Sequence, residues 1–192
     1  MPPQSKRRET SLLTIDCINP FTEAHRKSIL IMATEADLKK LYAAYRHTSD
    51  IDEKGQFFSP SCIQICRTQP AYAATNRETI VRYLHESASD APKPKGCYTI
   101  RPLRADEFEF STDETVKAAG FETARQLKEK AESEGWVGMR VDLWSGDIPE
   151  GMLVKVQYWW KKEAGTWMQI LHDIMYLGPR DGTEGTEGEI LE

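Results

Sequence analysis

The stretch Gly151–Gly178, GMLVKVQYWWKKEAGTWMQILHDIMYLG, decides the fold of this chain. It contains two runs of aromatic and aliphatic residues, joined by the polar segment Lys161–Gly165. This pattern predicts a long antiparallel β-hairpin with a polar turn. Side chains alternate across a strand, so each strand has one apolar face. The two faces hold Met152, Val154, Val156, Tyr158 and Trp160 on the first strand, and Met168, Ile170, His172, Ile174 and Tyr176 on the second.

His172 is the ionisable residue of these two apolar faces. A register that keeps the faces together places it opposite Val154 or Val156. An imidazole titrates near neutral pH and therefore suits general acid–base chemistry. A histidine on an apolar strand face can equally be a structural residue, hydrogen-bonded to a tyrosine or a carbonyl. The sequence leaves both interpretations open.

The composition indicates one soluble domain. A chain of 192 residues with 40% hydrophobic content can build a real core, and its net charge of -5 argues against nucleic acid and anionic membranes as partners. No apolar run is long enough to span a bilayer, and the N-terminus lacks the apolar centre of a secretory signal. The cysteines and histidines show no paired metal-ligand spacing, and no glycine-rich phosphate loop is present. We therefore expect a cytoplasmic protein with reduced thiols, no metal and no cofactor.

The chain divides into three parts. Residues 1–33 are predicted to be an N-terminal extension, partly disordered or with one extra helix, and translation could start at Met1 or at Met32. Residues 34–178 are predicted to be the folded domain, with a helical insertion at about 111–134. Residues 179–192 form an acidic, glycine-rich segment that we expect to be a disordered tail.

Within the domain, periodicity and turn residues predict the remaining elements. Capping boxes at Thr34 and Thr75 are expected to open two helices, the first with the apolar stripe Leu38, Leu41, Tyr42 and Tyr45. Strands are expected at 59–68, 97–103, 136–144, 152–160 and 167–177, with a further possible strand at 107–110.

This order of elements, with the motifs SPSCIQI, NRETIVRYL and YWWKKEAGTW, resembles the nuclear-transport-factor-2-like, or SnoaL-like, superfamily from Thr34 to Pro179. The resemblance implies an α+β fold in which a cone-shaped, strongly curved antiparallel sheet wraps around about three helices. It also implies a pocket between sheet and helices and frequent formation of homodimers.

Within the superfamily, the hairpin looks most like that of the scytalone dehydratases, but their catalytic set does not carry over. Tyr45 matches one of their water-holding tyrosines. The other positions of that set fall on Arg46, Cys66, Cys97 or Tyr98, Arg140, Val154 and Val156. The same dehydration mechanism is therefore not expected, and the matching positions mark a cavity rather than a chemistry.

The candidate catalytic residues are His172, as general acid or base, and Tyr45, as a hydrogen-bond donor to an oxyanion. The candidate substrate-binding residues are Tyr42, Tyr98, Val154, Val156, Tyr158, Trp160, Cys66 and His85.

These residues suggest a cofactor-free dehydratase, isomerase or cyclase, that is, a lyase or isomerase acting on an apolar polyketide- or terpenoid-like molecule. The alternative is a non-catalytic ligand-binding or dimerisation module of the same fold. Pocket volume separates the two, because Trp160, Tyr158 and Met168 would exclude a substrate if they closed the cone.

We also expect the insertion to act as a lid at the pocket mouth. An apolar outer patch is expected to form the contact of a homodimer, through Leu153, Trp136, Trp144 and Trp159.

Overall fold

The protein is represented by a computed structural model that describes residues 23–88, 96–145 and 151–192, with the backbone alone for 23–33. The chain divides into two compact units, 1–33 and 34–192. The helix α1, Glu23–His47, begins in the first unit and continues into the second. Thr34 therefore lies inside a continuous helix and does not open one, which corrects the predicted capping box. Residues 1–22 of the predicted extension lie outside the described residues.

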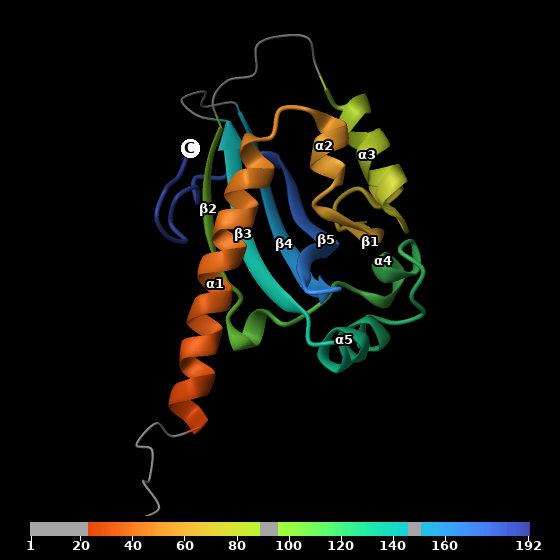
Figure 1. Cartoon of the computed structure of the whole chain (residues 1–192). Helices are drawn as coiled ribbons and strands as arrows, with labels where there is room; N and C mark the ends of the chain where they lie inside the picture. The colour runs from red at the N-terminus through yellow and green to blue at the C-terminus, as the bar shows by residue number, and fades with distance from the viewer. Residues whose placement is uncertain (1–22, 89–95, 146–150) are drawn as a thin grey trace, which may run out of the picture. The chain divides into compact units, whose positions relative to one another are not determined.

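The second unit is built on a curved five-stranded sheet (Figure 1). Its strands are β1 (Phe58–Cys66), β2 (Gly96–Pro102), β3 (Val137–Ser145), β4 (Met152–Glu163) and β5 (Thr166–Pro179). They lie side by side in the order β1-β5-β4-β3-β2. Three of the four pairings are antiparallel, and β1 pairs with β5 in parallel. The α+β class is as predicted, whereas the parallel edge strand departs from the expected all-antiparallel sheet.

The hairpin of β4 and β5 turns on two residues only. Glu163 pairs with Thr166, and the backbone of Ala164 and Gly165 has φ angles of 47° and 87°. Two successive residues with positive φ form the kind of tight turn whose twist matches that of the strands. The turn is therefore shorter than the predicted segment Lys161–Gly165, and the strands are correspondingly longer.

Two bulges in β5 set which side chains share a face. The register shifts between Trp159 and Trp160 and again between Lys155 and Val156, which leaves Ile170 and Met175 without partners on β4. A bulge of one residue reverses the alternation of the side chains that follow it. As a result His172 lies opposite Tyr158 and not opposite Val154 or Val156, which corrects the predicted register.

The inner face of the sheet packs against α1, α2 (Ile51–Gly55) and α3 (Arg77–Glu86). Asn76 caps α3 by accepting a hydrogen bond from the backbone N–H of Thr79 at 2.9 Å, so the helix begins one residue later than a cap at Thr75 predicts. The inner core contains Leu38, Tyr42, Tyr45, Phe58, Cys62, Ala74, Ile80, Tyr98, Ile100, Met139, Val141, Val156, Tyr158 and Trp160.

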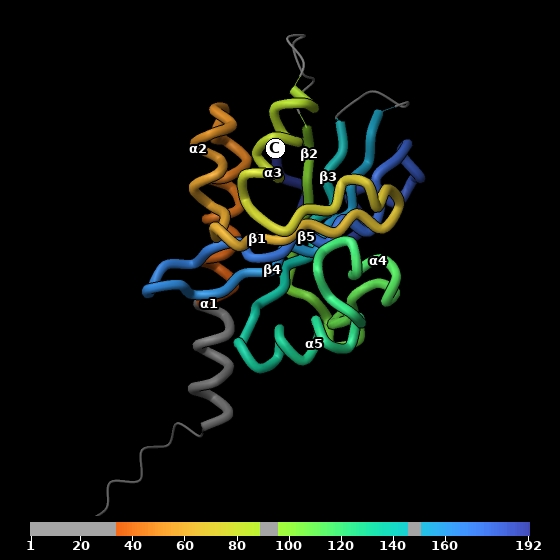
Figure 2. The backbone as a smooth tube through the Cα atoms, turned by 90° about the vertical axis from the view of Figure 1, so that its right-hand side faces the viewer, coloured from red at the N-terminus to blue at the C-terminus, as the bar shows by residue number. Residues whose placement is uncertain are grey.

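The outer face is covered by the insertion. The helices α4 (Asp113–Lys117) and α5 (Ala124–Ser133) lie on the opposite side of the sheet from α2 and α3 (Figure 2). They form a second core with Trp159, Leu171 and Ile65. The insertion is therefore packed core structure on the outer face, and its predicted role as a lid beside the mouth is wrong.

The loop before the insertion also differs from prediction. Residues 107–110 are not a strand, because a 3-10 turn at Ala105–Glu107 leads into an extended loop. The rings of Phe108 and Phe110 in this loop each lie 4.9 Å from the ring of Trp159. The segment predicted as a strand is thus a loop whose aromatic side chains cover the second core.

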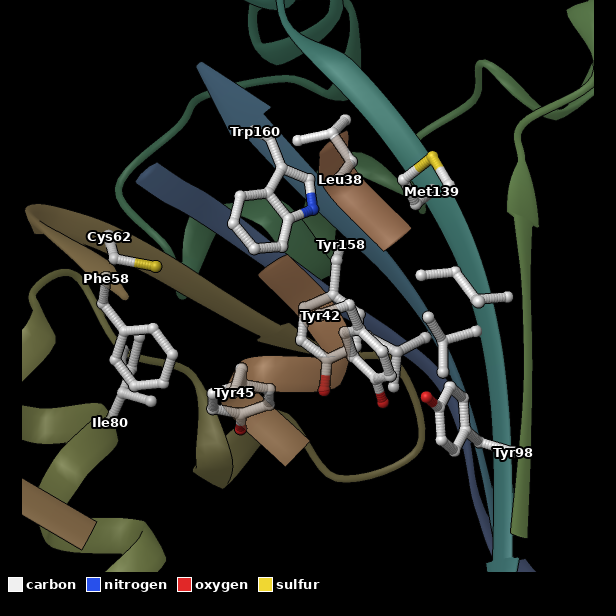
Figure 3. Close-up of a cluster of buried hydrophobic side chains, with 14 residues drawn as sticks. Leu38, Tyr42, Tyr45, Phe58, Cys62, Ile80, Tyr98, Met139, Tyr158 and Trp160 are labelled. Atoms are coloured by element: carbon white, nitrogen blue, oxygen red, sulfur yellow. The ribbon is translucent and has the colours of Figure 1, made fainter. Parts of the chain in front are cut away.

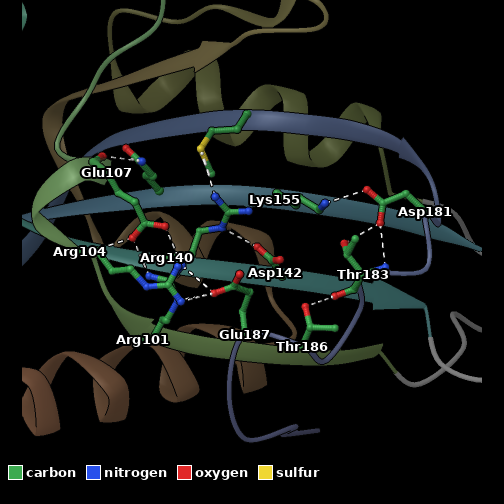
Figure 4. A network of polar contacts seen from close by, with 12 residues as sticks. Arg101, Arg104, Glu107, Arg140, Asp142, Lys155, Asp181, Thr183, Thr186 and Glu187 are labelled. Carbon is green, nitrogen blue, oxygen red and sulfur yellow. Dashed lines mark hydrogen bonds and ion pairs between the residues drawn. The ribbon is translucent and has the colours of Figure 1, made fainter.

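The C-terminal segment is docked onto the sheet, which corrects the prediction of a disordered tail. Asp181 pairs with Lys155 at 2.7 Å, and Glu187 pairs with Arg101 at 2.9 Å (Figure 4). Leu191 forms a bridge with Tyr98 on the edge strand β2. Charged glycine-rich sequence is typical of disorder, but here its carboxylates pair with cations of β2 and β4.

The predicted outer patch is buried within the chain. Trp136, Trp144 and Trp159 are 7%, 6% and 0% exposed, and Leu153 is 0% exposed. The prediction that these side chains form an exposed subunit contact is therefore wrong, because α5 and the C-terminal segment occupy the face on which the contact was expected.

The second core provides a test of whether the insertion is part of the packed core. Replacing Leu127, which is fully buried in the second core, by alanine should lower the free energy of unfolding by about 2 to 5 kcal/mol, because it leaves a cavity beside Trp159. Arg125→Ala on the same helix is the control, since this side chain is 86% exposed and should change stability by less than about 0.5 kcal/mol. Urea titration of both variants measures the difference. Equal stabilities would contradict a core role for α5.

Candidate functional site

Four tyrosines converge inside the inner core. The ring of Tyr42, on α1, is their centre: it lies 5.9 Å from that of Tyr45, 5.3 Å from that of Tyr98 and 5.2 Å from that of Tyr158. Their hydroxyls gather in one region between α1 and the sheet (Figure 3). We call Tyr42, Tyr45, Tyr98 and Tyr158 the tyrosine cluster. It joins three separate elements, because α1 contributes two of its members and β2 and β4 one each.

Burial fixes the protonation state of these phenols. It raises the pKa of Tyr42, Tyr45 and Tyr158 well above the ordinary value of tyrosine, partly offset by the positive charge of Arg46. Burial also raises the pKa of Tyr98. The cluster is therefore a set of neutral hydroxyl donors at physiological pH.

The hydroxyl of Tyr42 is the unusual member. The residue is 0% exposed, and among the described residues its oxygen has no well-formed hydrogen bond, although the phenol of Tyr158 lies close enough to affect its ionisation. A buried hydroxyl without a partner costs about 1 to 3 kcal/mol of stability. Such a group in a native core calls for an explanation, and a bound ligand is one.

His172 adjoins the cluster through Tyr158. Its ring lies 4.9 Å from the rings of both Tyr158 and Phe58, edge to face, and the residue is 4% exposed. Its Nε2 donates a hydrogen bond to Oε1 of Gln169 at 2.7 Å. Burial lowers the pKa of His172 to about 3, so the imidazole is neutral at physiological pH and is a weak base.

Two further polar atoms near His172 lack partners among the described residues. They are Nε2 of Gln169 and Nε1 of Trp160, which belong to directly paired residues of β5 and β4. The thiol of Cys62 lies 3.9 Å from Nε2 of His172, and burial raises its pKa, so it is a protonated thiol. This end of the core thus presents donors rather than a base.

The predicted substrate-binding residues are only partly brought together. The inner core contains Tyr42, Tyr98, Val156, Tyr158 and Trp160, with Val154 partly buried against it.

Cys66 and His85 lie elsewhere. Cys66 is buried at the end of β1, with its sulfur 3.8 Å from the hydroxyl of Thr68. His85 is on the surface of α3, where its Nε2 lies 3.0 Å from a carboxylate oxygen of Asp52. Neither contacts the tyrosine cluster in the part of the chain that is described.

Side chains fill the middle of the cone. Tyr158 and Trp160 are 7% and 0% exposed, and both pack in the inner core. Met168, the third residue expected to close the cone, pairs with Lys161 and is not part of that core, because the bulge at Ile170 moves it to the other face.

The outer face carries paired charges instead of a catalytic constellation. Asp173 is 0% exposed and accepts from Arg67 at 2.6 and 2.9 Å, and Asp142 pairs with Arg140 at 2.6 Å (Figure 4). The partners of both carboxylates belong to the same chain. Ion pairs buried in this way are satisfied and hold no spare group for chemistry.

A small cavity of about 120 Å³ lies on the outer side, between α5 and the hairpin. Its charged residues are already engaged, because Glu134 accepts from Lys130 at 2.6 Å and from Lys161 at 2.8 Å. It is distant from the tyrosine cluster and does not extend the candidate site.

Sequence reasoning missed two residues of the site. Gln169 was assigned to the opposite face from His172, and only the bulge at Ile170 brings the two together. Arg46 entered the sequence analysis only as a position where the dehydratase catalytic set does not carry over. Its position directly after Tyr45, on the helix that carries the cluster, was a usable signal.

The residues that the structure describes contain no group of histidine, cysteine and acidic side chains arranged to hold a metal ion. Over the same residues, none of the helices combines the length and apolarity needed to cross a membrane.

Comparison with known proteins identifies relatives of this fold. A family model described as SnoaL-like domain matches residues 28–192. No curated protein matches the chain. Among solved structures, a candidate scytalone dehydratase from Novosphingobium aromaticivorans aligns with 11% identity and a TM-score of 0.46, covering 83% of this chain and 94% of that one. A candidate calcium/calmodulin dependent protein kinase II association domain from Xanthomonas campestris aligns with 14% identity and a TM-score of 0.41, covering 84% and 90%.

The pKa of His172 generates a prediction about pH. The folded protein binds this proton only near pH 3, whereas an unfolded histidine binds it near 6.5. The unfolded state therefore gains protons as the pH falls below about 6.5, and stability falls with it. This residue should make the protein about 2 kcal/mol less stable at pH 5 than at pH 7.

The measurement is urea unfolding between pH 5 and 7 for the wild type, His172→Phe and, as a control, His85→Gln. The slope of stability against pH should flatten in His172→Phe and remain in His85→Gln, whose side chain is 52% exposed. An unchanged slope in His172→Phe would show that the imidazole titrates normally in the folded state.

Proposed function

The chain belongs to the SnoaL-like domain family, and from that premise we propose that its tyrosine cluster binds a small, largely apolar molecule that carries an oxygen function. The observation that carries this proposal is the wholly buried hydroxyl of Tyr42, which has no well-formed hydrogen bond among the described residues, although contact with Tyr158 affects its pKa. A carbonyl or hydroxyl oxygen of a ligand would satisfy it. The surrounding aromatic rings suit a polyketide- or terpenoid-like body.

We further propose that the domain acts on this molecule without a cofactor, as a dehydratase, isomerase or cyclase. Reactions of these types pass through an enolate or a departing hydroxyl. Neutral phenols can stabilise either by donating hydrogen bonds from a dry environment. Tyr42 and Tyr45 would be the donors, since their raised pKa values keep them protonated.

His172 has a different role in this proposal from the one predicted from the sequence. With a pKa of about 3 it is too weak a base to remove a proton at neutral pH. Its hydrogen bond to Gln169 fixes the orientation of that amide instead. His172 is thus proposed as a positioning residue, and water or the substrate itself as the proton acceptor.

A second candidate function is a non-catalytic ligand-binding module of the same fold. The packing of Tyr158 and Trp160 in the middle of the cone favours it, because these side chains reduce the space in which a substrate could move through a reaction. The two functions differ in turnover rather than in binding.

Hydrogen exchange of an enolisable ketone tests the proposal. We expect the wild type to accelerate exchange of the α-hydrogens of 2-tetralone in deuterated water, followed by NMR, because the phenols stabilise its enolate. Tyr42→Phe should reduce the acceleration by roughly 100-fold, as removal of an oxyanion donor does. Tyr72→Phe is the control, since Tyr72 is 44% exposed and lies outside the cluster.

The same variant has a stability readout. Removal of an unpartnered buried hydroxyl should leave Tyr42→Phe as stable as the wild type or more stable by about 1 kcal/mol. Saturable binding of 2-tetralone without acceleration would support the binding module over the enzyme. Neither binding nor acceleration would refute both functions.

A further inference from the structure

Arg46 lies beside the tyrosine cluster at the C-terminal end of α1. Its guanidinium carbon is 5.9 Å from the ring centroid of Tyr98, within the range of a cation–π contact. Tyr98 also contacts Tyr42, at 5.3 Å between ring centroids, so one ring links the cation to the unpartnered hydroxyl. The side chain is half-buried, which is unusual for an arginine on a helix end.

The backbone at Gly96 allows this approach. A Cβ atom at that position would stand 3.0 Å from a terminal nitrogen of Arg46, closer than ordinary contacts permit. Because glycine has no Cβ, a terminal nitrogen of Arg46 can lie close to the first residue of β2.

Arg46 has no counter-charge among the described residues. No carboxylate in that part of the chain pairs with it, whereas other half-buried arginines of the domain have one: Arg67 pairs with Asp173, Arg101 with Glu107 and Arg140 with Asp142. A guanidinium offers donors arranged to fit a carboxylate, so the missing partner is most simply an anionic group from outside the chain.

The electrostatics of the cluster agree with this geometry. The charge of Arg46 acts on Tyr42, Tyr45, Tyr98 and Tyr158, and in each case it opposes the effect of burial on the phenol pKa. The positive charge therefore lies close enough to act on all four phenols, whose hydroxyls gather in one region (Figure 3). A ligand there would meet one cation and several neutral donors.

We propose that Arg46 and the hydroxyl of Tyr42 together bind the carboxylate of an aromatic or polycyclic acid, with the ring of Tyr98 against its apolar body. This inference rests on the proposed function, and it specifies the oxygen function that Tyr42 meets: a carboxylate, bound more tightly than the oxygen of a neutral ketone or alcohol. Arg46 is then a specificity-determining residue.

A matched pair of probes tests the inference on the full chain. The probes are 2-naphthoic acid, ionised at neutral pH, and 2-naphthamide, which has nearly the same shape without the charge. Calorimetric titration of the wild type should show the acid binding at least about tenfold more tightly than the amide, as expected for a charge-assisted hydrogen bond. Because this comparison needs no variant, it decides the question even if a substitution impairs folding.

Variants then locate the charge. Arg46→Gln should remove the preference for the acid and leave binding of the amide unchanged, while Tyr42→Phe should weaken the acid. Arg82→Gln is the control, since this arginine is 63% exposed on α3. Equal affinities of acid and amide in the wild type would overturn the inference and leave the proposed function standing. A retained preference in Arg46→Gln would also overturn it, and binding of neither probe would overturn both.

Discussion

The two bulges of β5 are the constraint on which the rest of the structure depends. Without the extra residue at Ile170, regular alternation would place Gln169 and His172 on opposite faces of the sheet. With it, both face the inner core and form a 2.7 Å hydrogen bond. The same irregularity lets the adjacent residues Ile170 and Leu171 both pack in the outer core. A single inserted position therefore serves the packing of both layers and the polar contact beside the candidate site.

The hairpin itself, the five strands and the helical stripe of Tyr42 and Tyr45 could be predicted from the sequence, because each depends on local periodicity and turn chemistry. The faces of β5 could not be predicted, since a bulge leaves no mark in the pattern of hydrophobic residues. The correct positions of His172 and Gln169 follow only from the pairing with β4. Local sequence patterns also could not predict the order of the outer strands, because the parallel pairing of β1 with β5 joins segments about a hundred residues apart.

Interpretations of exposed surface failed for a related reason. The apolar outer face around Trp159 suggested an interface because the sequence does not reveal that the insertion folds back over it. The C-terminal segment appeared disordered by composition, yet Asp181 and Glu187 find cations on neighbouring strands. In both cases, contacts that we expected with a second subunit or with solvent are made by a segment of the same chain that is distant in sequence. The residues of the tyrosine cluster could be placed in the core from the sequence, because they lie on one helix stripe and on the inner faces of β2 and β4.

The covering of both faces of the sheet has a consequence for sequence divergence in this domain. A strand such as β4, with Tyr158, Trp159 and Trp160 all buried, has no side on which residues can drift freely. Sequence change that alters ligand preference without loss of folding is confined to positions outside these two layers, such as the end of α1 and the first residues of β2. Arg46, half-buried at the end of α1, lies outside these two layers and against the ring of Tyr98.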